Sequence, residues 1–295
     1  MRKNALSICC FTCAAGAIGA FCRWLQNQLA FDETGLSATS AWNYIVPLVL
    51  IAAAVCFYCI VARYKRSGLE MTTDFYGTFD GSTRLFVPLA WVIGAAMVFG
   101  ALILIATGAA DANAVLYRIL AVLGVVSGLA FGATAMAARR RYQPGLVCAL
   151  ATAPVLQFCL WLITSYKVNS TNPTVWVYAV EILAIAAAAL AFYYFAGYPY
   201  GRCKPYSSLY FSMLGAFLCI VALADDRNSG LQLMLVSAVC MQLFWAWMIT
   251  AHRHAPLPSA GETAPAGETS PAGEEKLADV SVNSILDEFH DGQEQ

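Results

Sequence analysis

A run of twenty uncharged residues, from Ile119 to Ala138, constrains most what this chain can fold into. It lies between Arg118 and the cluster Arg139-Arg140-Arg141. As an α-helix it would rise about 1.5 Å per residue, which is enough to cross a hydrocarbon layer roughly 30 Å thick. The triple arginine should stay in the cytosol, because short cytosolic loops hold the excess of Lys and Arg. The run therefore predicts an oriented membrane-spanning helix.

The same pattern recurs along residues 1–254 and predicts an all-α, polytopic membrane protein. Only 12% of all residues are charged, whereas soluble domains have about 25%. Each apolar run ends at charged residues or at a turn rich in Pro, Gly, Asn or Asp. We expect eight transmembrane helices in four hairpins, at residues 5–30, 42–62, 85–107, 118–138, 146–165, 175–198, 206–224 and 231–251.

The distribution of basic residues predicts the orientation of these helices. With the N-terminus in the cytosol, the cytosolic ends and loops collect twelve Lys and Arg residues, whereas the outer ends collect four. Such an asymmetry is typical of inner-membrane proteins. We therefore expect a multi-pass protein of the cell inner (plasma) membrane, in contact with the lipid bilayer and with both termini in the cytoplasm.

The first apolar run has two interpretations. Arg2 and Lys3 precede an apolar stretch rich in small residues, which is the composition of a cleaved signal peptide. The alternative is a first transmembrane helix that is retained. Apolar residues continue past the small ones to Leu29, which favours the retained helix.

The chain changes character at residue 255. Residues 255–295 contain nine acidic residues and one base, whereas residues 1–254 have a net charge of +7 with histidine neutral. Residues 255–280 repeat Pro, Gly, Ala and Glu, a composition that buries too little apolar surface to fold. We expect this segment to be a disordered acidic linker.

Residues 281–295 follow that linker and have a different pattern. Ile285, Leu286 and Phe289 fall at helical spacing, which predicts a short amphipathic docking peptide. The leading functional hypothesis is therefore a membrane-embedded interaction or sensory protein whose cytosolic tail binds a protein partner.

Three ionisable residues near the outer ends of the spans suggest an alternative function. Glu181 is an acid within a span, and Arg23 and Arg118 are expected at a comparable depth. Ionisable groups inside membranes often mark ligand sites or ion relays. These three residues could thus form the site of a small-solute or ion carrier. The competing interpretation is a structural ion pair, with arginines that extend to the headgroups.

Gly124, Gly128 and Gly132 repeat at a spacing of four along one face of the predicted helix 118–138. Such a face allows two helix backbones to approach closely. We expect it to pack within the chain, with the small residues of span 175–198 as natural partners. A homodimer contact through the same face is the alternative.

Two Cys-x-x-Cys pairs, Cys10 with Cys13 and Cys56 with Cys59, are predicted at similar depth on the two helices of one hairpin. Four thiolates on facing helices could bind zinc or an iron–sulfur cluster. The alternative, which we favour, is that these cysteines pack as small apolar residues. We therefore expect no metal and no cofactor.

Short motifs at the two ends of the chain resemble bacterial multi-span inner-membrane proteins of unassigned function. The first includes Arg23-Trp-Leu-Gln26 and the loop from Phe31 to Leu36, and the second is Ile285-Leu-Asp-Glu-Phe289. Those proteins often have a D-x-x-T-G loop, where this chain has Asp-Glu-Thr-Gly, and an acidic-apolar C-terminal peptide. The resemblance implies a bacterial inner-membrane protein and no particular activity.

No catalytic motif supports an enzyme. The chain lacks a phosphate-binding G-x-x-x-x-G-K-[ST] loop, a G-x-S-x-G nucleophile motif and an H-E-x-x-H zinc motif. It also lacks a basic stripe with interleaved aromatic residues, so we expect no nucleic-acid partner.

Overall fold

The computed structural model describes residues 2–30, 41–67, 70–71, 75–76, 86–107, 113–170, 175–251 and 253–254. Within these ranges it confirms the predicted fold class, with eight helices long and apolar enough to cross a membrane. They are α1 (Arg2–Leu29), α2 (Trp42–Arg66), α4 (Phe86–Thr107), α5 (Ala114–Arg139), α6 (Pro144–Asn169), α7 (Val175–Ala196), α8 (Pro205–Ala222) and α9 (Ser229–Ala251).

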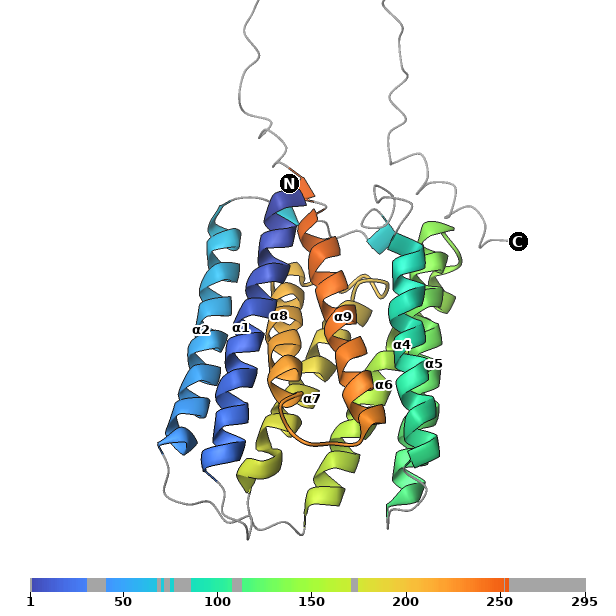
Figure 1. The fold of residues 1–295 in the computed structure, drawn as a ribbon. Coiled ribbons are helices and arrows are strands. Elements are labelled where there is room, and N and C mark those ends of the chain that lie inside the picture. The colour runs from blue at the N-terminus through green and yellow to red at the C-terminus, as the bar shows by residue number, and fades with distance from the viewer. Residues whose placement is uncertain are drawn as a thin grey trace, which may run out of the picture. The chain divides into compact units, whose positions relative to one another are not determined.

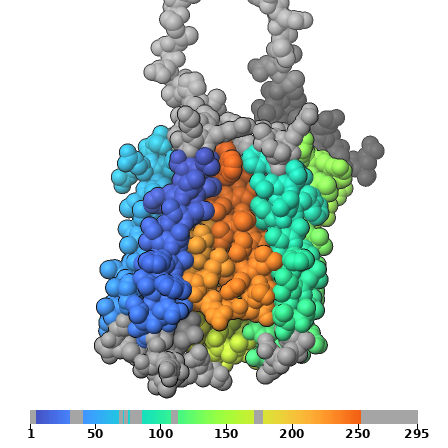
Figure 2. Space-filling view, viewed as in Figure 1, coloured from blue at the N-terminus to red at the C-terminus, as the bar shows by residue number. Residues whose placement is uncertain are grey.

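Helices α4 to α9 form a closed ring in which each helix packs on the next and α9 packs on α4 (Figure 1). Helix α1 packs outside this ring against α8 and α9, and α2 packs against α1 and α8. Figure 2 shows the surface of α9 between α1 and α4. We call the end of the bundle where α8 joins α9 the Asp225 end, and the other the Arg139 end.

Turn residues set several helix starts. Helices α6 and α8 begin at Pro144 and Pro205, since proline fits the first turn of a helix, where its missing N–H is not needed. Helix α9 begins after Asn228, whose side-chain Oδ1 accepts a hydrogen bond of 2.9 Å from the backbone N–H of Gly230. Gly201, in the turn before α8, has φ +69°, a conformation that glycine adopts without strain.

A two-residue ladder lies at the Arg139 end. Strand β1 (Glu70–Met71) pairs antiparallel with β2 (Arg253–His254), so that Met71 is opposite Arg253. The ladder ties the α2–α4 connection to the chain that leaves α9. The helices belong to one compact unit, Met1–Pro256. The predicted linker and the docking residues Ile285, Leu286 and Phe289 lie outside the described residues.

The glycine face of α5 packs on α4, and not on α7 as expected from the sequence. A Cβ atom added at Gly94 of α4 would collide with the backbone oxygen of Gly128. A Cβ at Gly132 would come within 2.6 Å of the Trp91 ring, and one at Gly124 within 2.9 Å of Met234 Cε on α9. The expectation of α7 was wrong because α5 and α7 lie on either side of α6 in the ring.

The outside of the bundle is apolar. Large side chains on its outer surface include Leu48 and Ile51 of α2, Val122 of α5 and Ile163 of α6, all at least half exposed. Such a surface would be unfavourable in water but matches the hydrocarbon of a bilayer. Together with the length of the helices, it makes this chain an integral membrane protein.

Candidate functional site

Buried charges gather at the Asp225 end of the bundle. In the part of the chain that the structure describes, the buried Asp, Glu, Lys and Arg residues are Arg23, Glu181 and Asp225. All three line one cavity of about 500 Å³. Its other lining residues are Asn27, Leu104, Tyr117, Trp161, Thr164, Ser165, Val168, Asn169, Tyr178, Asp226, Arg227, Asn228 and Leu231.

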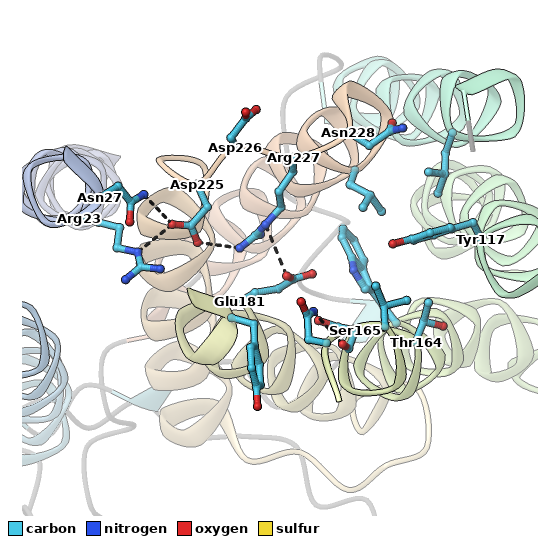
Figure 3. Close-up of a pocket in the computed structure, with 16 residues that line it drawn as sticks. Arg23, Asn27, Tyr117, Thr164, Ser165, Glu181, Asp225, Asp226, Arg227 and Asn228 are labelled. Atoms are coloured by element: carbon cyan, nitrogen blue, oxygen red, sulfur yellow. Dashed lines mark hydrogen bonds and ion pairs between the residues drawn. The ribbon is translucent and has the colours of Figure 1, made fainter. Parts of the chain in front are cut away.

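The charged side chains of the cavity form a chain of alternating sign (Figure 3). Arg23 Nε donates to Asp225 Oδ1 at 2.7 Å, and Arg227 Nη2 donates to Asp225 Oδ2 at 2.7 Å. Arg227 Nε lies 3.4 Å from Glu181 Oε2. The four side chains are between 1% and 11% exposed, so their interactions are little screened by solvent. We call Arg23, Asp225, Arg227 and Glu181 the charged network.

Amide side chains extend the charged network toward α2. Gln26 Oε1 accepts from Arg23 Nη1 at 2.6 Å, and Gln26 Nε2 donates to Asn43 Oδ1 at the start of α2 at 3.2 Å. Asn27, one helical turn after Arg23, donates to Asp225 Oδ1 at 3.0 Å. Polar contacts therefore run from α2 through α1 and the α8–α9 connection to α7.

The short α8–α9 connection explains why Asp225 and Arg227 are buried. Six residues separate the end of α8 at Ala222 from the start of α9 at Ser229, and Asn228 already caps α9. A connection this short cannot move all of its charged side chains away from the helix ends. Asp226, between the two buried side chains, also lines the cavity but is exposed, and in Figure 3 its carboxylate points away from the charged network.

One face of α6 forms the opposite wall. Trp161, Thr164, Ser165, Val168 and Asn169 follow the helical period, so their side chains share a face, and all line the cavity. In Figure 3, Tyr117 of α5 lies beside this wall, across from the charged network. The cavity thus has a charged side and a side of aromatic and hydroxyl groups.

Two polar atoms of the cavity walls have no hydrogen-bond partner among the described residues. They are Arg227 Nη1 and Ser165 Oγ, and both atoms are buried. A buried polar group without a partner costs roughly 1–3 kcal/mol, and more when it is charged. Both atoms belong to residues that line the cavity, so a molecule bound there could supply the missing partners.

The structure places two of the three candidate ionisable residues in this cavity. Arg23 and Glu181 both line it, joined through Asp225 and Arg227 rather than by direct contact. Arg118 is exposed and is not a lining residue. Its neighbour Tyr117 faces the cavity instead, because consecutive helix positions point in directions about 100° apart.

Sequence reasoning missed Asp225 and Arg227 as site residues. The expected spans 206–224 and 231–251 leave both residues in the connection between two helices, where charged residues usually contact solvent. A signal was present, since three charged residues fall within six positions between two apolar helices. A connection that short cannot move all of its charges away from the helix ends.

The structure does not bring the two cysteine pairs together as a metal site. Cys10, Cys13, Cys56 and Cys59 are all exposed on the surfaces of α1 and α2. Across the described ranges, there is no group of three or more His, Cys, Asp or Glu residues that could bind a metal ion.

The fold and the cavity define a polytopic integral membrane protein with a charged, partly buried cavity at one end of its bundle. Comparison of the chain with family models, with curated proteins and with solved structures finds no match. The site must therefore be interpreted from its own geometry.

Proposed function

We propose that this protein binds a small polar solute in the cavity and carries it across the membrane. The observation that supports this most is the cavity itself, of about 500 Å³, with a buried charged network on one wall. Its volume is within the roughly 300–1,000 Å³ of small-molecule sites. Ionisable groups that face a cavity inside a helical bundle commonly mark a solute or ion pathway.

Polar side chains deeper in the ring favour transport over binding alone. Ser127 of α5, Gln157 of α6, Ser212 of α8 and Gln242 of α9 lie near the middles of their helices and are buried. Each has a buried oxygen without a partner, as far as the described residues extend. These groups are costly in a static apolar interior, and they would hydrogen-bond a polar solute that passes through the ring.

Along α6, Trp161 lies between Gln157 of this deeper level and the other cavity residues of the helix. It lines the cavity, is 1% exposed and lies one helical turn from Gln157 on the same face of α6. In the proposed path, a solute that leaves the cavity toward the Arg139 end displaces the Trp161 indole. In this mechanism the charged network holds the solute, and Trp161 closes the path below it.

A substitution that fills the cavity should block transport. Val168→Trp places a large side chain on the cavity wall of α6, and we expect it to lower uptake at least tenfold, about the loss of 1.4 kcal/mol in binding. Uptake would be measured by mass spectrometry in proteoliposomes supplied with a carbon-13-labelled mixture of amino acids, sugars, organic acids and polyols. Ile163→Trp, on the exposed side of the same helix, is the matched control and should keep normal uptake. Absence of uptake by the unsubstituted protein, or equal uptake by both variants, would contradict the carrier.

The C-terminal peptide supports a second hypothesis, which comes from the sequence pattern. In this hypothesis Ile285, Leu286 and Phe289 bind a cytosolic protein, the protein senses a signal, and both termini lie in the cytoplasm of a bacterial cell. Deletion of residues 281–295 should then abolish the cellular phenotype while solute uptake in proteoliposomes stays unchanged. A phenotype that survives the deletion would rule out docking as the essential function.

A further inference from the structure

The charged network and the cavity also indicate the chemical class of the solute. We infer that the cavity binds a small zwitterion of amino-acid size, with a carboxylate group and an ammonium group. This inference rests on the proposed function, because it concerns the same cavity.

The environment of Arg227 indicates that the solute has a carboxylate group. Its guanidinium has five N–H donors in a planar fork. Nη2 donates to Asp225 and Nε faces Glu181, whereas Nη1 is buried without an acceptor within the described ranges. The Ser165 hydroxyl, on the wall formed by α6, is a second buried donor of this kind. A carboxylate has two oxygens, and each can accept from a buried donor of this kind.

The environment of Glu181 indicates that the solute has an ammonium group. Its Oε2 lies 3.4 Å from Arg227 Nε, which is longer than the roughly 2.7–3.2 Å of a protein hydrogen bond. A carboxylate has about four acceptor positions, so Glu181 keeps capacity for donors that enter from the cavity it lines. In Figure 3 the Glu181 carboxylate lies below Arg227, on the side of Ser165 and Thr164.

The charges of the network favour a zwitterion over a singly charged solute. Its four described side chains contribute two positive charges, from Arg23 and Arg227, and two negative charges, from Asp225 and Glu181. A simple anion or cation would bring an uncompensated charge into a site of low dielectric constant, which is costly. A zwitterion adds no net charge and still pairs with each sign. Asp226 does not change this balance much, because it is exposed and therefore screened.

The remaining walls of the cavity suit the rest of the solute. Leu104, Leu231 and Trp161 give the cavity an apolar surface next to the polar groups. Such a surface suits the side chain of a neutral amino acid better than the hydroxyl groups of a polyol, which would lose their hydrogen bonds with water there.

Thermal stability of the purified full-length protein in lipid nanodiscs tests the solute class. A ligand that binds the folded state raises the melting temperature. We expect neutral L-amino acids, tested singly, to include at least one that raises it. Propionate has only the anionic group, ethylamine only the cationic group and glycerol neither, so these three should have no effect. The inference is overturned if one of them stabilises the protein as much as the best amino acid, or if no amino acid stabilises it.

Ser165→Ala tests the placement of the carboxylate. It removes a hydroxyl that has no partner within the described ranges, so the melting temperature without ligand should not fall. The dissociation constant of the best amino acid should rise roughly 5- to 10-fold, the usual effect of losing one hydrogen bond. Ser170→Ala, at the exposed end of α6 and outside the cavity lining, should bind normally. An unchanged dissociation constant in Ser165→Ala would overturn this placement.

The two proposals fail in different ways. If a sugar or an organic acid is taken up and amino acids neither bind nor enter, the zwitterion inference is wrong and the carrier remains. If amino acids bind and no solute is taken up, the zwitterion site is supported and the proposal of transport is wrong.

Discussion

Asp225→Asn should destabilise the folded protein by about 3–5 kcal/mol, the typical cost of removing one partner from a buried ion pair. The Asp225 carboxylate accepts from both Arg23 and Arg227, at 2.7 Å each. Without its charge, both guanidinium groups lose this acceptor, and the four side chains of the charged network carry one more positive than negative charge. We expect a lower yield of monodisperse protein after detergent extraction and a lower melting temperature.

Asp226→Asn is the matched control for this change. Asp226 is the next residue in the same α8–α9 connection, and the substitution is chemically identical, but its side chain is exposed. Exposed charges contribute little to stability, typically less than about 1 kcal/mol. Equal losses in the two variants would show that the connection tolerates no substitution, and would contradict a specific role of the Asp225 ion pairs.

Gly94→Ala should separate α4 from α5 and destabilise the bundle by about 1–3 kcal/mol, the range expected for overpacking. The added methyl group would collide with the Gly128 backbone oxygen, and a backbone atom cannot move away without shifting its helix. Thermal unfolding in detergent, followed by loss of monodisperse protein, would measure the effect.

Substitutions of two other glycines serve as controls for this measurement. Gly145, near the start of α6, has no atom within 4 Å of an added Cβ in the described part of the chain, so Gly145→Ala should be neutral. Gly124→Ala should lie between the two, because its nearest contact is the flexible end of Met234, at 2.9 Å. If Gly94→Ala is as stable as Gly145→Ala, close contact between the α4 and α5 backbones does not limit the fold.

The number of helices could be predicted because each membrane span is a local property of the sequence. A helix such as α5 needs only an apolar run of sufficient length between charged ends, and both are visible without knowledge of its neighbours. The order of the helices around the ring depends instead on which faces pack together. The partner of the Gly128 face was therefore assigned wrongly, to the span of α7 instead of α4.

The site was harder to predict than the fold. The depth of the site in the membrane could be predicted, since Glu181 is an acid within a span and Arg23 is near a span end. The sequence did not show which side of each helix faces the cavity. For this reason Arg118 was grouped with Arg23 and Glu181, although Tyr117 is the residue that lines the cavity. Asp225 and Arg227 were missed because the short connection indicates that some of its charges stay at the helix ends, but not which of its three charged side chains turn inward.

The contact between Arg23 and Asp225 also has a consequence for biosynthesis. The two residues are 202 positions apart, so α1 enters the membrane long before the α8–α9 connection has been translated. Until then the arginine lacks its Asp225 partner, and its long side chain can reach the headgroup region. The contact of Arg23 with Asp225 therefore has to wait for the last hairpin. A chain that terminates before the α8–α9 connection lacks this contact between its first helix and the end of α8.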